Sequence, residues 1–446
     1  MSLAQRLVWL DGVFTVAILA AASAVWAPAG GGPVWLTAAR VALVGAVCLA
    51  AFYYNDLYDF EVPHDTGELF TRLCRALALA AFALAVAYFL FPHLILGGNL
   101  ASYALLVTLI GVLALRTLVY ALAKRPRFSE GVVIMGGGAL AAEVAEHIRR
   151  RPDLALRLVG VLAPDAALVP GPRLGSYTDV ADVVRRHRAE RVIVAMPERR
   201  GSLPVTDLLA CRFRGVRVED GTQVFERFTR RLAVESLTPS ALIFGDGFRV
   251  SRTQLALKRA LSVVIAVVGL VAAAPLMAAL ALLIVLESRG PVFFVQERVG
   301  LHGRPFRLVK FRTMRELDPA DDDVWRRDNA SRVTRVGAVL RRYRLDEIPQ
   351  FFNILRGDMS LVGPRPEMAT NVAPLAAAIP FYSLRHAVRP GLTGWAQIKA
   401  GYAMTTEEVT RKLCYDLYYI KHLSLAFDLR ILFDTVKFVL SGKRPG

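Results

Sequence analysis

The sequence predicts a membrane protein of mixed class, which combines transmembrane helices with two α/β parts, and three observations support this prediction. Of its 446 residues 54% are hydrophobic, and these are concentrated in long blocks. Short apolar strands alternate with helical stretches through residues 130–235, as expected for a parallel sheet. The uncharged run from Ala260 to Leu286 is long enough to cross a membrane, but it contains Pro275.

The first predicted domain, residues 1–125, is a four-helix transmembrane bundle with apolar blocks near 7–26, 34–54, 76–91 and 101–122. Each block can approach or cross a hydrocarbon core of ~30 Å, although the third is short. The connections between blocks one and two and between blocks three and four carry no Lys or Arg, whereas Lys124, Arg125 and Arg127 follow the fourth. The positive-inside rule therefore places both ends of the bundle in the cytoplasm. Almost no charge lies within the blocks, which favours an anchor over a transport path.

The charge balance bears on the partners of the protein. Basic residues outnumber acidic ones by 55 to 38, which gives a formal net charge of +17. Nucleic acid attracts such proteins, but in a chain with membrane blocks anionic lipid or a phosphorylated substrate fits better, and we expect no nucleic-acid partner. The four cysteines show no paired or metal-ligating spacing, so no disulfide framework is predicted.

Residues 126–250 are predicted to form an α/β domain on the cytoplasmic side. The stretch GGGALA at 136–141 is similar to a truncated dinucleotide fingerprint, in which glycines let a helix N-terminus approach phosphate. No acidic ribose ligand ends the second predicted strand, because Asp165 lies past it and after a proline. A structural or regulatory role is therefore favoured, and an oxidoreductase that binds NAD(P) here is the weaker alternative.

The third predicted domain, residues 251–446, begins with a membrane helix at 258–287. A simple span would place everything after it outside the cell, yet both of its flanks are basic. Pro275 removes a backbone donor and kinks a helix, and the pieces on either side are each too short to cross. A re-entrant helix that bends at Pro275 and returns to the same face satisfies these observations. A kinked spanning helix is the alternative.

Basic residues gather after a hairpin predicted around Gly300 and Gly303. Lys310, Arg312 and Arg315 are spaced so that some of them point the same way. Such clusters bind phosphate, with arginine as a bidentate fork and lysine as a point charge, although a basic patch on the membrane surface fits the spacing equally well. The aspartates at 318–323 could bind Mg2+, but proline and consecutive like charges favour a solvated loop.

Asp346 and Glu347 form an adjacent acid pair within this basic region. Arginines precede the pair, and Arg365 follows it between two prolines. A surface network of ion pairs is the usual explanation of such a pattern. A carboxylate can also act as a nucleophile on phosphorus, which requires neighbouring cations and usually Mg2+. The residues alone indicate a phosphoryl-transfer site at the membrane surface.

Four motifs identify a resemblance: KFRTM, LDEIPQFFNILRGDMSLVGPRPE, VRPGLTGWAQ and YDLYYI. On them, the region at about 255–446 resembles the bacterial sugar transferase family, the monotopic phosphoglycosyl transferases. The whole layout is similar to the long polyprenyl glycosylphosphotransferase form, with four N-terminal helices and a Rossmann-like middle domain. The stretch ESLTPSALIFGDGFR further resembles the subgroup found with exosortase/PEP-CTERM exopolysaccharide clusters.

The resemblance implies an activity and its partners. Members of the family move a sugar-1-phosphate from a UDP-sugar to undecaprenyl phosphate in the inner membrane and release UMP on the cytoplasmic face, where they initiate exopolysaccharide or glycan assembly. The reaction is ping-pong, with a covalent aspartyl-phosphosugar intermediate. Mg2+ is the implied cofactor. A homodimer and downstream glycosyltransferases are the implied protein partners.

The resemblance also assigns roles to residues. Asp346 would be the nucleophile and a Mg2+ ligand, and Glu347 would assist it. The implied substrate-binding residues are Lys310, Arg312, Arg341 and Arg365. Pro275 would mark the re-entrant break of a catalytic domain that enters only one leaflet.

The sequence departs from the family pattern at two places. Ala274 stands where many members have Ser, and Tyr343 and Arg344 stand where many have Thr-Ser. We expect neither departure to abolish activity, although Arg344 could alter donor preference. The alternative function is a membrane scaffold or regulator that recruits other polysaccharide enzymes through its middle domain.

Overall fold

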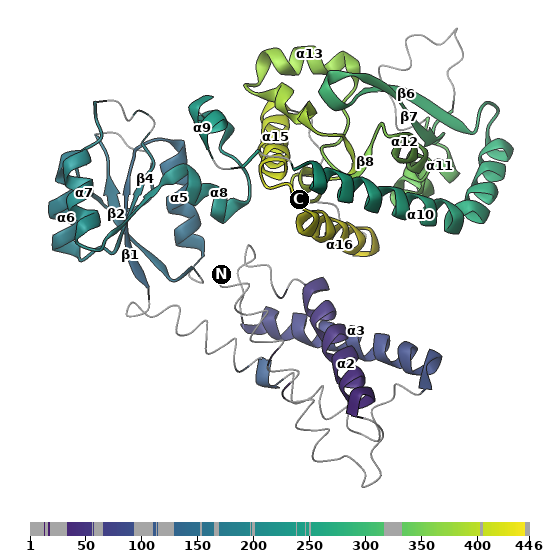
Figure 1. The fold of residues 1–446 in the computed structure, drawn as a ribbon, viewed down its shortest axis with the longest axis horizontal. Coiled ribbons are helices and arrows are strands. Elements are labelled where there is room, and N and C mark those ends of the chain that lie inside the picture. The colour runs from purple at the N-terminus through teal and green to yellow at the C-terminus, as the bar shows by residue number, and fades with distance from the viewer. Residues whose placement is uncertain are drawn as a thin grey trace. The chain divides into compact units, whose positions relative to one another are not determined.

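A computed structural model describes the chain in two compact units, Met1–Val224 and Phe225–Gly446 (Figure 1). The second unit therefore begins before the predicted domain start at residue 251. The described residues are 34–55, 57, 66–92, 110–112, 114, 129–151, 154–164, 169–196, 198, 201–237, 239–245, 247–248, 251–315, 332–401 and 405–441, together with residues 13 and 17.

Two helices of the N-terminal region are described, α2 (Val34–Tyr54) and α3 (Thr66–Leu90). They match the second and third predicted blocks, while most of the blocks at 7–26 and 101–122 lies outside the described residues. α3 begins ahead of its predicted start because the arginines in its first turns are good helix formers and do not end it. The two helices pack through small and aromatic residues, among them Cys48, Phe52 and Ala76.

A five-stranded parallel sheet follows, in the order β3-β2-β1-β4-β5, and it confirms the predicted α/β region. The central strands are almost fully buried because their VVIM and VIV runs face apolar partners on both sides. The strands are β1 (Glu130–Met135), β2 (Leu156–Leu162), β3 (Arg173–Gly175), β4 (Arg191–Val194) and β5 (Arg217–Asp220). The helices of this part of the chain are α5 (Ala139–Arg150), α6 (Val180–His187), α7 (Val205–Phe213) and α8 (Gly221–Thr229).

The glycine turn after β1 is explained by packing. A Cβ at Gly136 would lie 2.3 Å from the carbonyl oxygen of Ala195, and its φ is +153°. Only glycine therefore fits where the ends of β1 and β4 meet. Gly138 is the residue at the N-cap of α5. The first glycine of GGGALA is thus required by the fold, whether or not a ligand binds there.

The second unit contains a large apolar core that includes Tyr382, Trp395 and Tyr419, all nearly inaccessible. Its first part contains α9 (Pro239–Phe244), α10 (Arg252–Glu287), the antiparallel hairpin β6 (Phe293–Val299) and β7 (Pro305–Phe311), α11 (Arg335–Arg342) and the 3-10 turn η7 (Leu345–Glu347). The remainder contains α12 (Gln350–Arg356), β8 (Ser360–Val362), α13 (Ala369–Ala378), η8 (Tyr382–Ala387), β9 (Gly391–Thr393), α14 (Trp395–Lys399), α15 (Thr406–Lys421) and α16 (Leu425–Ser441).

The predicted local signals in this unit are present. The hairpin turns around Gly300 and Gly303, and α15 begins with the capping box of Thr405 and Glu408. β8 and β9 pair in parallel and approach closely, since a Cβ at Gly391 would lie 2.1 Å from the nitrogen of Gly363. The glycines of GPRP and PGLTG thus bring these two motifs together.

α10 is a single helix that contains Pro275, so the proline does not end the helical hydrogen-bond pattern. Together with the stretch Phe70–Leu90 of α3, it is one of two described helices long and apolar enough to cross a membrane by length and composition. Figure 1 shows that α10 changes direction before it reaches β6. Its two ends contact the same domain: Arg259 donates to the carbonyl of Leu355, and Glu287 accepts from the amides of Arg335 and Val336.

Candidate active site

The acid pair lies on η7, a single 3-10 turn between α11 and α12. Arg344, just before it, has φ of +58°, a left-handed conformation that is uncommon for a side chain of this size. This backbone reversal turns the chain inward, so that Asp346 and Glu347 are only 9% and 8% exposed. Burial of two adjacent carboxylates requires compensation by cations. The two acids are therefore not part of an exposed network of ion pairs, which is one of the two interpretations that the sequence allows.

Glu347 is held by Arg365, which comes from the loop after β8. The Arg365 Nη2 to Glu347 Oε1 distance is 3.0 Å, and Arg344 Nη1 lies 3.4 Å from the same oxygen. Burial alone would raise the pKa of Glu347, but Arg365, Lys310 and Arg344 together lower it below its ordinary value. The side chain of Arg365 remains 40% exposed. It can therefore contact both Glu347 and a solute.

Asp346 differs from its neighbour. Its Oδ1 atom is buried and has no hydrogen-bond partner among the described residues. Burial and the adjacent Glu347 raise the pKa of Asp346, although Lys310, Arg344 and Arg341 oppose this. The two carboxyl groups are thus driven apart in pKa, a pattern typical of groups with different chemical tasks. Of the two carboxyl groups, Asp346 is the one with a buried oxygen that accepts no hydrogen bond from the described residues.

Lys310 supplies a nearby cation from the end of β7. Burial and the neighbouring Arg365 lower the pKa of Lys310 to about 8, against the opposing effect of Glu347 and Asp346. A lysine in this range carries much of its charge near neutral pH and loses it in mild base. The structure therefore brings Lys310, Asp346, Glu347 and Arg365 together.

The other two predicted cations lie differently. Arg341, on α11, acts electrostatically on Asp346 while its Nε donates to Thr313 Oγ1 at 2.9 Å. Arg312 makes its hydrogen bonds at the end of α10. Its guanidinium donates to the carbonyls of Ser288 and Arg289 at 2.7 and 2.6 Å, where α10 has just ended. The contacts of Arg312 thus stabilise the helix exit, since the last carbonyls of a helix lack partners within it.

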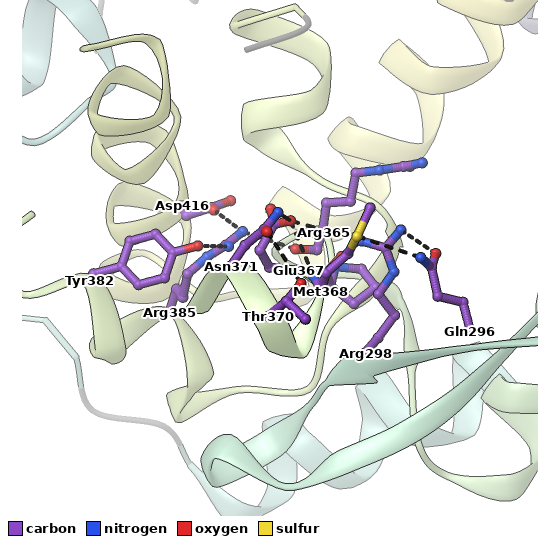
Figure 2. A network of polar contacts seen from close by, with 11 residues as sticks. Gln296, Arg298, Arg365, Glu367, Met368, Thr370, Asn371, Tyr382, Arg385 and Asp416 are labelled. Atoms are coloured by element: carbon purple, nitrogen blue, oxygen red, sulfur yellow. Dashed lines mark hydrogen bonds and ion pairs between the residues drawn. The ribbon is translucent and has the colours of Figure 1, made fainter. Parts of the chain in front are cut away.

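Sequence reasoning missed two arginines beside the site, Arg298 on β6 and Arg385 on η8. Figure 2 shows both in a polar network with Glu367 and Asp416. Arg385 is buried and pairs with Asp416 at 3.0 Å. The YDLYYI motif contains this aspartate, but its sequence alone indicates only a helix. A buried acid within an otherwise apolar helix face was the signal that could have pointed to a buried cation.

The oxygen donors at the site bear on metal binding. No group of three or more His, Cys, Asp or Glu side chains forms a metal cluster in the part of the chain that the structure describes. The aspartates at 318–323 lie outside that part. Asp346, with its buried free oxygen, is a hard ligand of the kind that Mg2+ prefers, and Mg2+ usually takes one or two carboxylates and completes its shell with phosphate and water.

The fold and the site define a protein with a buried, cation-flanked carboxylate pair beside a long apolar helix. The chain matches the family described as bacterial sugar transferase over residues 253–442 and the one described as CoA-binding domain over residues 54–203. A glucose-1-phosphate transferase named for UDP-glucose and undecaprenyl phosphate, from Klebsiella pneumoniae, is 30% identical over 73% of this chain and 72% of its own length. The chain belongs to the bacterial sugar transferase family.

Other relatives are similar over shorter stretches. An N-acetylgalactosaminephosphotransferase of Aeromonas hydrophila, named for undecaprenyl phosphate, is 43% identical over 53% of this chain and 55% of its own length. An undecaprenyl-phosphate glucose phosphotransferase of Komagataeibacter xylinus is 37% identical over 70% and 59%. The chain thus spans between half and two thirds of these two relatives. Family membership is established, while the exosortase-associated subgroup stays a prediction.

The different environments of the two acids predict opposite effects on stability. Asp346→Asn removes a buried charge that lacks a hydrogen-bond partner, so we expect the melting temperature to stay the same or rise. Arg365→Gln leaves Glu347 buried with weaker compensation, and we expect a loss of about 1–2 kcal/mol, or several degrees. Thermal unfolding of the detergent-purified variants measures both. A melting temperature that falls more in Asp346→Asn than in Arg365→Gln would contradict this assignment.

Proposed function

We propose that the protein transfers a sugar-1-phosphate from a UDP-sugar to undecaprenyl phosphate, releases UMP and so initiates assembly of an exopolysaccharide or related glycan. Family membership and the names of the relatives support the substrate classes. The observation that carries the proposal is the environment of Asp346, whose buried oxygen lacks a partner while cations surround its neighbour.

Asp346 acts as the nucleophile in this proposal. Its carboxylate oxygen attacks the β-phosphorus of the UDP-sugar, and the bond from that phosphorus to the oxygen bridging the two phosphates breaks. UMP leaves with this oxygen, and an acyl phosphate joins Asp346 to the sugar phosphate. A phosphate oxygen of undecaprenyl phosphate then attacks the same phosphorus, which releases Asp346 and forms the lipid diphosphate sugar. The two half-reactions give ping-pong kinetics.

The neighbouring residues prepare this chemistry. Glu347 does not compete for the substrate's phosphorus because Arg365 holds it as an ion pair. Lys310 on β7 and Arg341 on α11 act electrostatically on Asp346. In this proposal, their positive charges also offset the negative charge of the substrate's phosphoryl oxygens. Arg365 is exposed enough to contact the nucleotide phosphate. These groups are fixed before substrate arrives, so little reorganisation accompanies the reaction.

Mg2+ is the proposed cofactor, with Asp346 as its protein ligand. The ion would neutralise charge on the diphosphate and stabilise the leaving phosphate. Because the described residues supply few acidic ligands here, the substrate's own phosphates and water would complete its shell.

The shape of α10 supports a re-entrant position in the membrane. Gly269 lies against Phe351 of α12, while Leu280 and Ile284 pack with Phe311 on β7. The segment between them, which contains Pro275, is exposed and apolar. Both arms of the helix therefore return to the same domain. We propose that the exposed bend enters the cytoplasmic leaflet of the inner membrane, which keeps η7 at the headgroup plane where a soluble nucleotide sugar and a lipid phosphate can meet.

The four-helix N-terminal bundle is proposed as an additional anchor. The homodimer and the downstream glycosyltransferases also remain proposals, and they rest on the family resemblance. The alternative is a scaffold that acts through the middle domain. In that case deletion of residues 130–235 would abolish polysaccharide production, whereas Asp346→Asn would not.

Substitution of Asp346 tests the catalytic role. We expect Asp346→Asn to lower UMP release from UDP-sugars in the presence of Mg2+ and undecaprenyl phosphate by about 10³-fold or more, since an amide is not a nucleophile toward phosphorus. A UMP-release assay with several UDP-sugars measures this and also identifies the donor. Arg307→Gln, on the exposed side of the same domain, is the control and keeps wild-type rates. Full activity in Asp346→Asn would exclude the proposed nucleophile.

The pH dependence tests Lys310. Because its pKa is lowered to about 8, Lys310 loses its positive charge as the pH rises through that value, and kcat/KM falls in mild base. Arginine stays protonated in this range, so Lys310→Arg should shift the basic limb to higher pH. Initial rates measured from neutral to alkaline pH on the wild-type protein and on Lys310→Arg provide the comparison. An unchanged basic limb would show that another group titrates there.

Thiol labelling tests the path of α10. In a variant whose four native cysteines are replaced by alanine, Ser251→Cys and Arg289→Cys place one reactive thiol at each end of the helix. A membrane-impermeant reagent should label both in inside-out vesicles and neither in right-side-out vesicles. Labelling of the two ends from opposite sides would instead establish a spanning helix.

A further inference from the structure

The loop that carries Arg365 depends on other elements for its shape. It follows β8 directly and contains Pro364 and Pro366, which have no amide hydrogen to donate. A buried loop must still satisfy each of its carbonyl oxygens. Hydrogen bonds from outside the loop therefore decide where Arg365 lies.

Four consecutive carbonyls of this loop accept such bonds. The amide of Gly391 donates to Pro364 at 2.9 Å, and the amide of Val299 donates to Glu367 at 3.0 Å. Between them, Arg385 Nη2 donates to the carbonyl of Arg365 at 2.9 Å and Arg298 Nη1 donates to that of Pro366 at 3.2 Å. Two of the four donors are thus side chains, which substitution can remove without changing the backbone.

Arg385 is fixed from three directions. Its Nη1 donates to Tyr382 Oη at 2.8 Å, and Nη2 contacts Asp416 Oδ2 at 3.0 Å as well as the Arg365 carbonyl. Both Arg385 and Asp416 are buried. A buried arginine whose contacts are all inside the protein does not bind substrate. Through its hydrogen bond to the carbonyl of Arg365, Arg385 instead holds the backbone of the loop in place.

Arg298 holds the next carbonyl from the opposite side. Its Nη2 donates to Gln296 Oε1 at 2.7 Å, and Nη1 lies 3.9 Å from Glu367. Gln296 in turn donates to the sulfur of Met368 at 3.5 Å. Figure 2 shows Arg298 and Gln296 on the strand side of the loop and Arg385 on the helix side.

We propose that Arg298 and Arg385 are positioning residues, which hold the backbone at Arg365 and Pro366 so that the Arg365 guanidinium is presented to Glu347 and to the donor's phosphate. This inference rests on the proposed function for its consequence in catalysis. The physical reason is that small displacements of a phosphate-binding group cost large factors in rate. The hydrogen bonds described above join Arg298 and Arg385 to the backbone of the loop that carries Arg365, and not to Asp346 or Glu347.

The first test needs no catalytic activity. Purified protein is treated with phenylglyoxal, which modifies accessible arginines, and peptide mass spectrometry gives the ratio of modification at Arg365 to that at the exposed Arg304. We expect this ratio to rise several-fold in Arg298→Gln, because a loosened loop weakens the ion pair between Arg365 and Glu347. Arg307→Gln, the same charge change on the neighbouring strand, should leave the ratio as in wild type. An unchanged ratio in Arg298→Gln would overturn the proposal.

The second test is a double-mutant cycle on kcat/KM for UMP release. Arg298→Gln should lower kcat/KM about tenfold in the wild-type background and less than about twofold in an Arg365→Gln background, because it acts through Arg365. Arg298→Lys, which can still donate one bond to Pro366, should recover part of the loss. Equal losses in both backgrounds would show that Arg298 acts independently of Arg365. Melting temperatures of all variants separate these effects from unfolding.

Two further variants complete the design. Gln296→Ala removes the acceptor that orients Arg298 without changing charge, and it should show a smaller loss with the same dependence on Arg365. Arg385→Lys keeps a cation beside Asp416 and should also raise the labelling ratio at Arg365. If wild-type protein releases no UMP from any UDP-sugar, the proposed function fails, whereas the labelling ratio still decides whether the two arginines position the loop.

Discussion

The ion pair between Arg365 and Glu347 is the interaction on which the rest of the site depends. Glu347 is buried, and without a close cation it would be protonated or would force the turn open. Arg365 pairs with Glu347, while the adjacent Asp346 keeps an oxygen that has no hydrogen-bond partner among the described residues. The same arginine stays partly exposed, so one side chain both pairs with one of the two carboxylates and faces solvent.

Several elements serve to place this pair. Glycines at the contact of β8 and β9 let the GPRP and PGLTG motifs lie side by side. Hydrogen bonds from two arginine side chains and two backbone amides fix the loop that contains GPRP and carries Arg365. On the other side, Glu287 at the end of α10 accepts from the first amides of α11, the helix that leads into η7. The apolar helix and the acid pair are therefore connected through a few charged contacts.

Much of this could be predicted from the sequence, because apolar strands that are buried on both faces and a proline-flanked arginine leave clear local patterns. The parallel sheet, the hairpin, the capping box of α15 and the family membership are of this kind. Long-range contacts leave no such pattern. Arg298 and Arg385 donate to carbonyl partners that lie 68 and 20 residues away in the sequence. The hydrogen bonds of Arg312 to the backbone at the end of α10 are likewise not visible in the sequence. The glycines after β1 show that a local pattern can have more than one cause, since close packing of two strand ends accounts for part of a nucleotide-binding pattern.

The central claim is that Asp346 carries the sugar phosphate during the reaction, and mass spectrometry tests it most directly. The protein is incubated with its UDP-sugar and Mg2+ in the absence of lipid acceptor, quenched, and digested. The account predicts that the peptide containing Asp346 gains the mass of the sugar phosphate, and that undecaprenyl phosphate removes it. Turnover to the lipid product with no adduct on that peptide, or an adduct at another residue, would contradict it.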